Sequence, residues 1–182
     1  MLPERVLAWP VTLRHFTGSD AERVELLAGD RSVADTTLLI PHPYPKGAAE
    51  AWIGTHAAER TLGSQYVYAI ERAEDGLLVG SIALRPAGGE RENVGYWIGR
   101  EFWGLGFATA ATQAVIALAF RCLDIQQITA SHLKRNPASG RVMEKAGMVV
   151  VAQETRLHRG REQAMIVRGI TRDAWERSVR GL

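Results

Sequence analysis

The chain has 182 residues, of which 46% are hydrophobic and 23% are charged, and this size and composition are typical of one globular domain. We therefore expect a single domain over residues 1–182. The formal net charge is only +2 and the basic residues are scattered, so we expect no nucleic-acid partner. The longest apolar run, residues 114–120, is far too short to cross a membrane, and we expect no membrane partner either.

Cysteine and histidine usage adds two further exclusions. The one cysteine, Cys122, excludes an intrachain disulfide, and together with a polar start that does not resemble a signal peptide it favours the reducing cytoplasm. No two of the five histidines stand at the spacing of a helical metal-ligand pair, so we expect no metal.

The first half of the chain predicts short strands and helices separated by clear turns. We expect strands at 11–13, 65–71, 77–84 and 93–98, helices at about 20–29 and 48–60, and a turn at 86–90. Ser19 or Asp20 caps the first helix, and Asp75-Gly76 is a strong hairpin signal. Three prolines in residues 40–45 exclude helix and central strand there, and this loop with Tyr44 either lines an acceptor site or forms a rigid surface loop.

The second half alternates helix and strand. Apolar and small residues at helical spacing predict a largely buried helix over residues 107–122, with Cys122 packed at its end. A second helix begins at Pro137 and stops at Gly147. Strands are expected at 128–133, 148–152 and 164–170. The mixture predicts an α+β fold, with antiparallel strands followed by a strand–helix–strand unit.

Residues 95–109 (GYWIGREFWGLGFAT) carry the strongest chemical signal, because a strand runs into a small-residue turn that opens a helix. Backbone amides in such a turn can close around an anion, helped by the helix dipole. Glycines that serve only a tight turn explain the spacing equally well. A dinucleotide-binding turn fits less well, because Gly104 does not follow directly on the strand and the next strand ends in Lys134-Arg135 rather than in an acid.

The segment 95–147 resembles the GNAT N-acetyltransferase superfamily, in particular its RimJ/RimL-like branch. That branch carries a G-Y-W-[IL] strand, a W-G-x-G-[YF]-A turn, and N-x-x-S before a helix that ends in E-K-x-G. The matching residues are 95–98 (GYWI), 103–108 (WGLGFA), 136–139 (NPAS) and 144–147 (EKAG). The resemblance implies a GNAT-type fold, with a mixed central sheet of about seven strands that is splayed in the middle and flanked by helices.

The same resemblance implies acetyl-CoA as co-substrate. Backbone amides of the turn would hold its pyrophosphate, its pantetheine arm would pair along the strand, and basic residues of the following helix would meet the adenosine phosphates. The implied cofactor-binding residues are Trp97, Ile98, Gly99, Trp103, Gly104, Leu105, Gly106, Phe107, Ala108, Thr109, Asn136, Ser139, Arg141 and Lys145.

Acyl transfer to an amine needs a polarised thioester carbonyl, a neutral amine and a proton for the departing thiolate. Superfamily members often carry a tyrosine acid seven residues after the asparagine; here that position is Met143, which makes Ser139 the better candidate, with Asn136 beside it. The branch commonly has a glutamate two residues before the strand glycine, but here Asn93 stands there and Glu92 is its neighbour. His132 is a second candidate base, although a satisfied interior histidine is the more frequent case.

These residues predict an N-acyltransferase that moves an acetyl group from acetyl-CoA to a primary amine by direct attack in a ternary complex. The acceptor could be a protein N-terminal α-amine or a small-molecule amine, and the sequence leaves open a longer or succinyl acyl group and a homodimer. The missing tyrosine and displaced glutamate leave one alternative of another class: an acyl-CoA-binding sensor or scaffold with little or no turnover. A dinucleotide-binding module is the weaker third hypothesis.

Overall fold

The computed structural model describes residues 2–88 and 91–181, with backbone alone at residues 87–88 and 91–92. One eight-stranded sheet runs through it in the order β1-β2-β3-β4-β5-β6-β8-β7. The strands are β1 (Arg5–Ala8), β2 (Val11–Arg14), β3 (Tyr66–Arg72), β4 (Leu78–Gly88), β5 (Arg91–Ile98), β6 (Gln127–Leu133), β7 (Val149–His158) and β8 (Arg161–Thr171). The expectation of about seven strands was one short, because β1 precedes the predicted first strand. The turn predicted at 86–90 was wrong at residues 86–88, which belong to β4, and its residues 89–90 lie outside the described residues.

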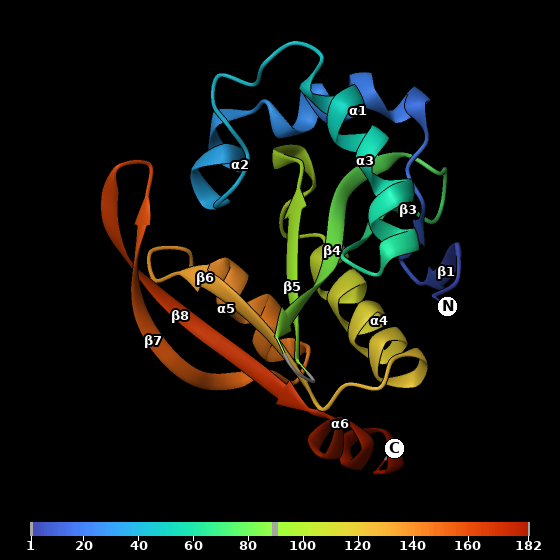
Figure 1. Ribbon diagram of the computed structural model, residues 1–182, viewed down its shortest axis with the longest axis vertical. Helices are drawn as coiled ribbons and strands as arrows, with labels where there is room; N and C mark the ends of the chain where they lie inside the picture. The colour runs from blue at the N-terminus through green and yellow to red at the C-terminus, as the bar shows by residue number, and fades with distance from the viewer. Residues whose placement is uncertain (1, 89–90, 182) are drawn as a thin grey trace.

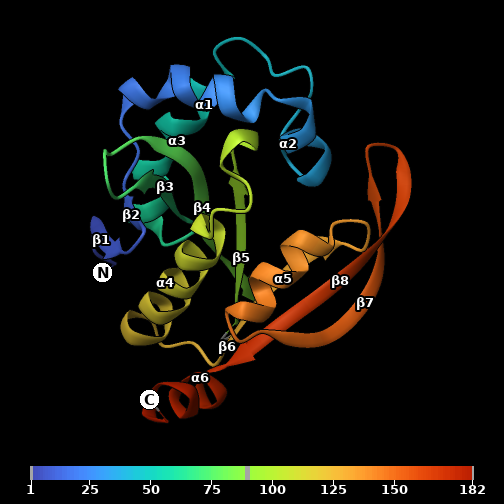
Figure 2. The same cartoon turned by 180° about the vertical axis from the view of Figure 1, so that it is seen from behind.

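Six α-helices connect and flank these strands in the described part of the chain (Figures 1 and 2). They are α1 (Ala21–Ala28), α2 (Arg31–Thr36), α3 (Ala48–Leu62), α4 (Phe107–Cys122), α5 (Pro137–Lys145) and α6 (Arg172–Arg180). Four of them were predicted, whereas α2 and α6 were not.

Two apolar clusters cover opposite faces of the sheet. On one face α1 and α3 enclose a small cluster that includes Val24, Ile53 and Leu78. On the other face α4 supplies the larger cluster with Phe107, Ala111, Val115, Ile116, Ala119 and Phe120, which confirms the predicted buried helix. The packing role expected for Cys122 was wrong, because Cys122 is the last residue of α4 and is exposed, beyond the buried Ala119 and Phe120.

The sheet splits between β5 and β6, the one parallel pair among the described strands. Their pairing covers only residues 91–93 of β5 and 127–129 of β6. Beyond it β5 continues to Ile98 beside β4, while β6 continues to Leu133 beside β8. The two strands therefore diverge, as Figure 1 shows, and this confirms the expectation of a sheet that is splayed in the middle.

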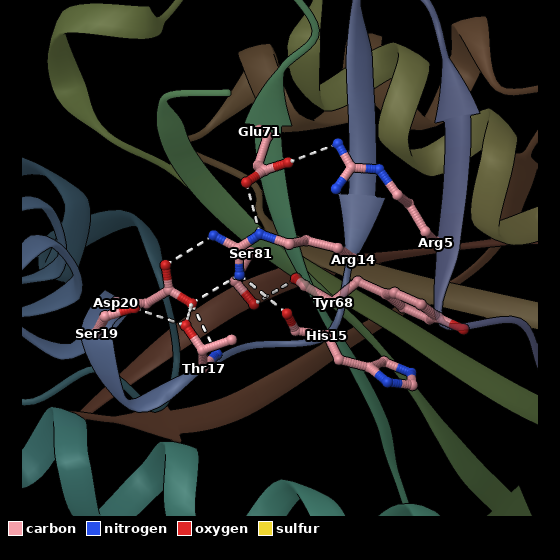
Figure 3. A network of polar contacts seen from close by, with 9 residues as sticks. All are labelled: Arg5, Arg14, His15, Thr17, Ser19, Asp20, Tyr68, Glu71 and Ser81. Carbon is pink, nitrogen blue, oxygen red and sulfur yellow. Dashed lines mark hydrogen bonds and ion pairs between the residues drawn. The ribbon is translucent and has the colours of Figure 1, made fainter. Parts of the chain in front are cut away.

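A polar network ties β2 and β3 to the start of α1 (Figure 3). The Arg14 guanidinium donates two hydrogen bonds of 2.7 Å to the Asp20 carboxylate and one of 2.5 Å to Glu71. Asp20 also accepts from the backbone N–H of Thr17 at 2.8 Å. Burial alone would raise the pKa of Asp20, but the hydrogen bonds from Arg14 and Thr17 outweigh it and leave that pKa below its ordinary value. The network fixes the start of α1, and Val24 and Ala28 of this helix line a cavity of the site described next.

Candidate active site

The turn before α4 is shaped to receive an anion. Gly104 and Gly106 have φ values of +81° and +84°, a left-handed conformation that side chains other than glycine rarely adopt. A Cβ atom placed on either glycine would meet no atom within 4 Å, so the space above both is open. Gly106 is the N-cap of α4 and offers no side-chain cap, which leaves first-turn amides for a ligand at the positive end of the helix dipole. The geometry fits a diphosphate group.

Trp103 forms one wall beside this turn. Its indole Nε1 donates a 2.7 Å hydrogen bond to the carbonyl oxygen of Ile98, and the Arg100 guanidinium lies 4.6 Å from the centroid of its ring. An extended ligand along β5 would therefore donate a hydrogen bond to the Ile98 carbonyl at the same time as Trp103. A carbonyl oxygen with two lone pairs can accept both bonds. The backbone N–H of Gly99 points toward β4 instead, where it donates to the Val79 carbonyl at 2.9 Å.

The start of α5 brings a hydroxyl pair into the gap between the splayed strands. Asn136 caps the helix, because its side-chain oxygen accepts from the backbone N–H of Ser139 at 3.2 Å. The Ser139 hydroxyl is 2.8 Å from the phenol oxygen of Tyr96 on β5, and either oxygen can donate. The Tyr96 hydroxyl also donates to the Ser139 carbonyl at 3.2 Å. Tyr96 and Ser139 thus bridge β5 and α5.

Tyr96 is the site residue that sequence reasoning missed. It stands inside the quoted GYWI motif, but 43 residues separate it from Ser139, and only the fold brings the two hydroxyls together. Burial raises the pKa of Tyr96 to about 12, and its hydrogen bond with Ser139 offsets part of that rise. The phenol is therefore protonated at neutral pH and can serve as a hydrogen-bond donor.

A cavity of about 290 Å³ lies between the turn, β5 and α5. Most of the residues predicted to bind the cofactor line it: Trp97, Ile98, Trp103, Gly104, Gly106, Phe107, Ala108, Thr109, Asn136, Ser139, Arg141 and Lys145. Gly99 and Leu105 do not line it. Gly99 is buried against Leu27, and Leu105 points outward with 55% of its surface exposed.

Two exposed cations, Arg141 and Lys145, flank this cavity from successive turns of α5. Gln113 of α4 donates to the Lys145 carbonyl at 2.9 Å and so fixes α5 against α4. The resemblance implied that these two side chains would contact the adenosine phosphates, and this remains a prediction.

A second cavity of about 550 Å³ opens on the other side of the hydroxyl pair. The segment 36–41, Tyr44, Trp52 and strands β4, β5 and β6 contribute its walls. The two cavities share Thr36, Thr37, Tyr96, Trp97 and Ser139, so they meet at the Tyr96–Ser139 pair. Pro41 and Tyr44 belong to the larger cavity, in agreement with the idea that the proline-rich loop lines an acceptor site.

The two candidate bases are placed differently. His132 lines the larger cavity, but its ring packs against α5: a Cβ on Gly140 would come within 2.9 Å of both Nε2 and Cε1. Its Nδ1 lies 3.0 Å from the Leu133 carbonyl, and Nε2 is buried without a partner in the described part of the chain. Glu92 belongs to β5 through its backbone, and its side chain lies outside the described residues. Met143, in the position of the family tyrosine, is buried.

The described residues contain neither a group of side chains that could hold a metal ion nor a helix that could span a membrane. Among residues 2–88 and 91–181, no group of three or more His, Cys, Asp or Glu side chains is arranged to hold a metal ion. In the same part of the chain, no helix has the length and apolar character needed to cross a membrane.

Comparison with known proteins reveals several relatives. The family described as "Acetyltransferase (GNAT) domain" matches residues 11–149. The putative ribosomal N-acetyltransferase YdaF of Bacillus subtilis is 34% identical over 77 residues, which is 41% of this chain and 42% of that protein. The alignment thus spans less than half of this curated relative.

Solved structures match over nearly the whole chain. A GNAT-family acetyltransferase from Bacillus anthracis superposes with a TM-score of 0.83 at 20% identity, covering 93% of this chain and 99% of that one. RimL, described as the ribosomal L7/L12 α-N-protein acetyltransferase in complex with coenzyme A, superposes with a TM-score of 0.84 at 15% identity, covering 94% and 99%. These likenesses establish the fold, and the family match covers most of the residues that build it. The chain belongs to the GNAT acetyltransferase family.

Proposed function

We propose that this protein transfers an acetyl group from acetyl-CoA to a primary amine, with residues 1–182 acting as one catalytic domain in the cytoplasm. The observation that carries the proposal is the meeting of two cavities at one hydroxyl pair, Tyr96 and Ser139. A thioester reaching this pair through the smaller cavity would face an amine arriving through the larger one. Such an arrangement suits direct attack in a ternary complex, because both reactants can be bound at once.

The smaller cavity fits the cofactor on three counts. Its turn offers open space and free amides for a diphosphate, its β5 wall offers an unpaired strand edge for an extended arm, and Arg141 and Lys145 offer positive charge at its border. The RimL structure, a fold relative, is described with coenzyme A bound. Acetyl-CoA supplies the activated acyl group, and the protein supplies binding and orientation.

Ser139 is the proposed hydrogen-bond donor to the sulfur as negative charge develops on it. Its hydroxyl is oriented by Tyr96, and its position in the first turn of α5 is fixed by the Asn136 cap. Because a thiolate is a good leaving group, a donor of modest acidity is sufficient there. The base remains a choice between Glu92 and His132 acting through water. Cys122 takes no part in this proposal, because it lines neither cavity.

The acceptor is proposed to be either a protein N-terminal α-amine or a small-molecule amine. The names of YdaF and RimL refer to ribosomal N-acetyltransferase activity and favour the first. The second candidate function, an acyl-CoA-binding sensor or scaffold, is favoured by the buried Met143 at the position where the family often carries its acid.

A thiol-release assay separates these two functions. The protein is incubated with acetyl-CoA and, in parallel, succinyl-CoA, against a panel of N-terminal peptides, polyamines and amino acids. Catalysis requires free thiol that appears only with an amine and in proportion to an acylated product. Tight acetyl-CoA binding without thiol release for any amine would favour the sensor and reject the enzyme.

A further inference from the structure

The larger cavity contains one cation, Arg85 of β4, whose charge is not neutralised by an ion pair in the described part of the chain. Arg85 pairs with Asn93 of β5, so its side chain lies beside β5, the strand that contains Trp97. A Cβ on Gly95 would lie 3.7 Å from Nη1 of Arg85. The guanidinium therefore lies over the backbone of Gly95, at ordinary van der Waals distance from the position that a Cβ atom would take.

Only the Nε edge of this half-buried guanidinium makes a hydrogen bond to a described residue. Its Nε donates to the side-chain oxygen of Gln65, whose Nε2 in turn donates to Glu59 at 3.2 Å. The two Nη groups have no hydrogen-bond partner among the described residues. Gln65 thus orients the guanidinium and separates it from Glu59, which leaves the Nη face free to bind a ligand.

An unpaired guanidinium in a partly dry cavity is an incomplete interaction. Burial lowers the pKa of Arg85, which reflects the cost of holding its charge away from water, and Glu59 offsets only part of that cost. Apolar and aromatic walls at Ile40, Tyr44 and Trp52 strengthen any charge pairing inside the cavity. A carboxylate would match the two free Nη groups bidentately. The nearby Glu59 makes a singly charged carboxylate more favourable than a doubly charged phosphate.

The strand fixes the distance between this cation and the reaction centre. Gly95, under the guanidinium, is two residues from Trp97, which lines both cavities and is the neighbour of Tyr96 on β5. Two residues along a strand span about 7 Å. Building on the proposed function, we infer that Arg85 determines acceptor specificity by binding a carboxylate that the acceptor carries about 7 Å from its reactive amine.

A binding experiment tests this inference independently of turnover. The probes are 6-acetamidohexanoate and its carboxamide, 6-acetamidohexanamide, which differ only in the charge of one end. Calorimetric titration of the CoA-saturated protein is expected to show at least tenfold tighter binding of the carboxylate, and Arg85→Gln should abolish the difference. Arg177→Gln, which removes the same charge from α6, a helix that lines neither cavity, should leave it unchanged. Equal binding of the two probes by the wild type, or no measurable binding of the carboxylate, overturns the inference.

Kinetics with the matching amines then separates acceptor recognition from catalysis. The wild type is expected to acetylate 6-aminohexanoate with at least tenfold higher kcat/KM than 6-aminohexanamide, mainly through KM. Arg85→Glu should reverse the preference in favour of 1,6-diaminohexane. A wild type that prefers the diamine would assign recognition to Glu59 and refute the role of Arg85. If no amine is acetylated while the carboxylate probe still binds through Arg85, the proposed function fails and the binding site stands.

Discussion

Replacing Gly106 by alanine isolates the part that the turn plays in cofactor binding. Gly106 has φ +84°, and a left-handed conformation costs a non-glycine residue about 1–2 kcal/mol. The added methyl meets no protein atom within 4 Å, so this conformational cost is the whole expected loss of stability. The same methyl occupies the open space where a diphosphate would approach the amides of α4. We expect at least a tenfold loss of acetyl-CoA affinity, equivalent to about 1.4 kcal/mol.

Gly76 provides a matched control for the backbone strain. It has φ +73° in the β3–β4 turn, a methyl group added there would likewise meet no atom within 4 Å, and it lines neither cavity. Urea unfolding should show similar losses of stability in Gly76→Ala and Gly106→Ala, while calorimetry should show weakened binding in Gly106→Ala alone. Unchanged affinity in a folded Gly106→Ala protein would refute the assignment of the turn as the diphosphate site, and an equal loss in Gly76→Ala would mean that strain alone explains it.

Three further substitutions test other parts of the molecule. Ser139→Ala should lower kcat by roughly ten- to a hundredfold and leave acetyl-CoA affinity within about threefold, as steady-state kinetics and calorimetry can measure, because the lost donor acts mainly in the transition state. Arg14→Met should lower the free energy of unfolding by about 3 kcal/mol in urea titrations, because it leaves the buried Asp20 carboxylate without its cation and leaves Glu71 with the more distant Arg5 at 3.4 Å. His56→Leu should become more stable relative to wild type as the pH falls, by about 2.5 kcal/mol between pH 7.5 and pH 4.5.

The sign of the last effect follows from the environment of His56. Burial, reinforced by the charge of Arg60, lowers the pKa of His56 to about 4, and both ring nitrogens lack partners within the described residues. The unfolded chain takes up a proton near pH 6.5, whereas the folded protein does not until about pH 4. The stability contributed by the neutral ring is complete above pH 6.5 and is lost as the pH falls toward 4. A pH-independent difference between His56→Leu and wild type would contradict this explanation.

Controls for the other two variants come from their contacts. In Ser139→Ala, the Tyr96 hydroxyl keeps its bond to the carbonyl of residue 139, so a large loss of stability would show that the residue is mainly structural. If Ser139→Ala weakens cofactor binding and spares turnover, its role is positioning of the cofactor. For Arg14→Met, a loss below about 1 kcal/mol would mean that water replaces the guanidinium at Asp20 and Glu71.

Local pattern was enough to predict the elements that carry strong periodicity. The buried helix was expected at residues 107–122, and α4 has these bounds. Apolar residues on all sides of a helix indicate that it is buried. By contrast, β1 has four residues and α2 has six, which is too short for either period to appear. The Thr171 cap of α6 was available in the sequence, but a helix that buries no residue fully has only a weak apolar signal.

The parts of the site that are formed by backbone could be predicted from the sequence. Contacts between side chains of elements far apart in the sequence could not. The turn at Gly104 and Gly106 could be predicted, because glycines between a strand and a helix indicate a tight turn, and both glycines have left-handed φ values in the structure. The bond between Tyr96 and Ser139 and the unpaired Nη groups of Arg85 depend on which strands become neighbours. Cys122 shows the converse: its helical spacing indicated burial, but the core ends before it, at Phe120.

The most direct test of the central claim is to follow acetyl transfer by intact-mass analysis of candidate amines. Wild-type protein is incubated with acetyl-CoA and each amine, and the product mass is compared with that from Gly106→Ala and Ser139→Ala. We expect one acetyl group on the amine, none retained on the protein, and slower transfer with both variants. A wild type that binds acetyl-CoA and leaves every amine unmodified, or that itself keeps the acetyl group, would contradict direct transfer.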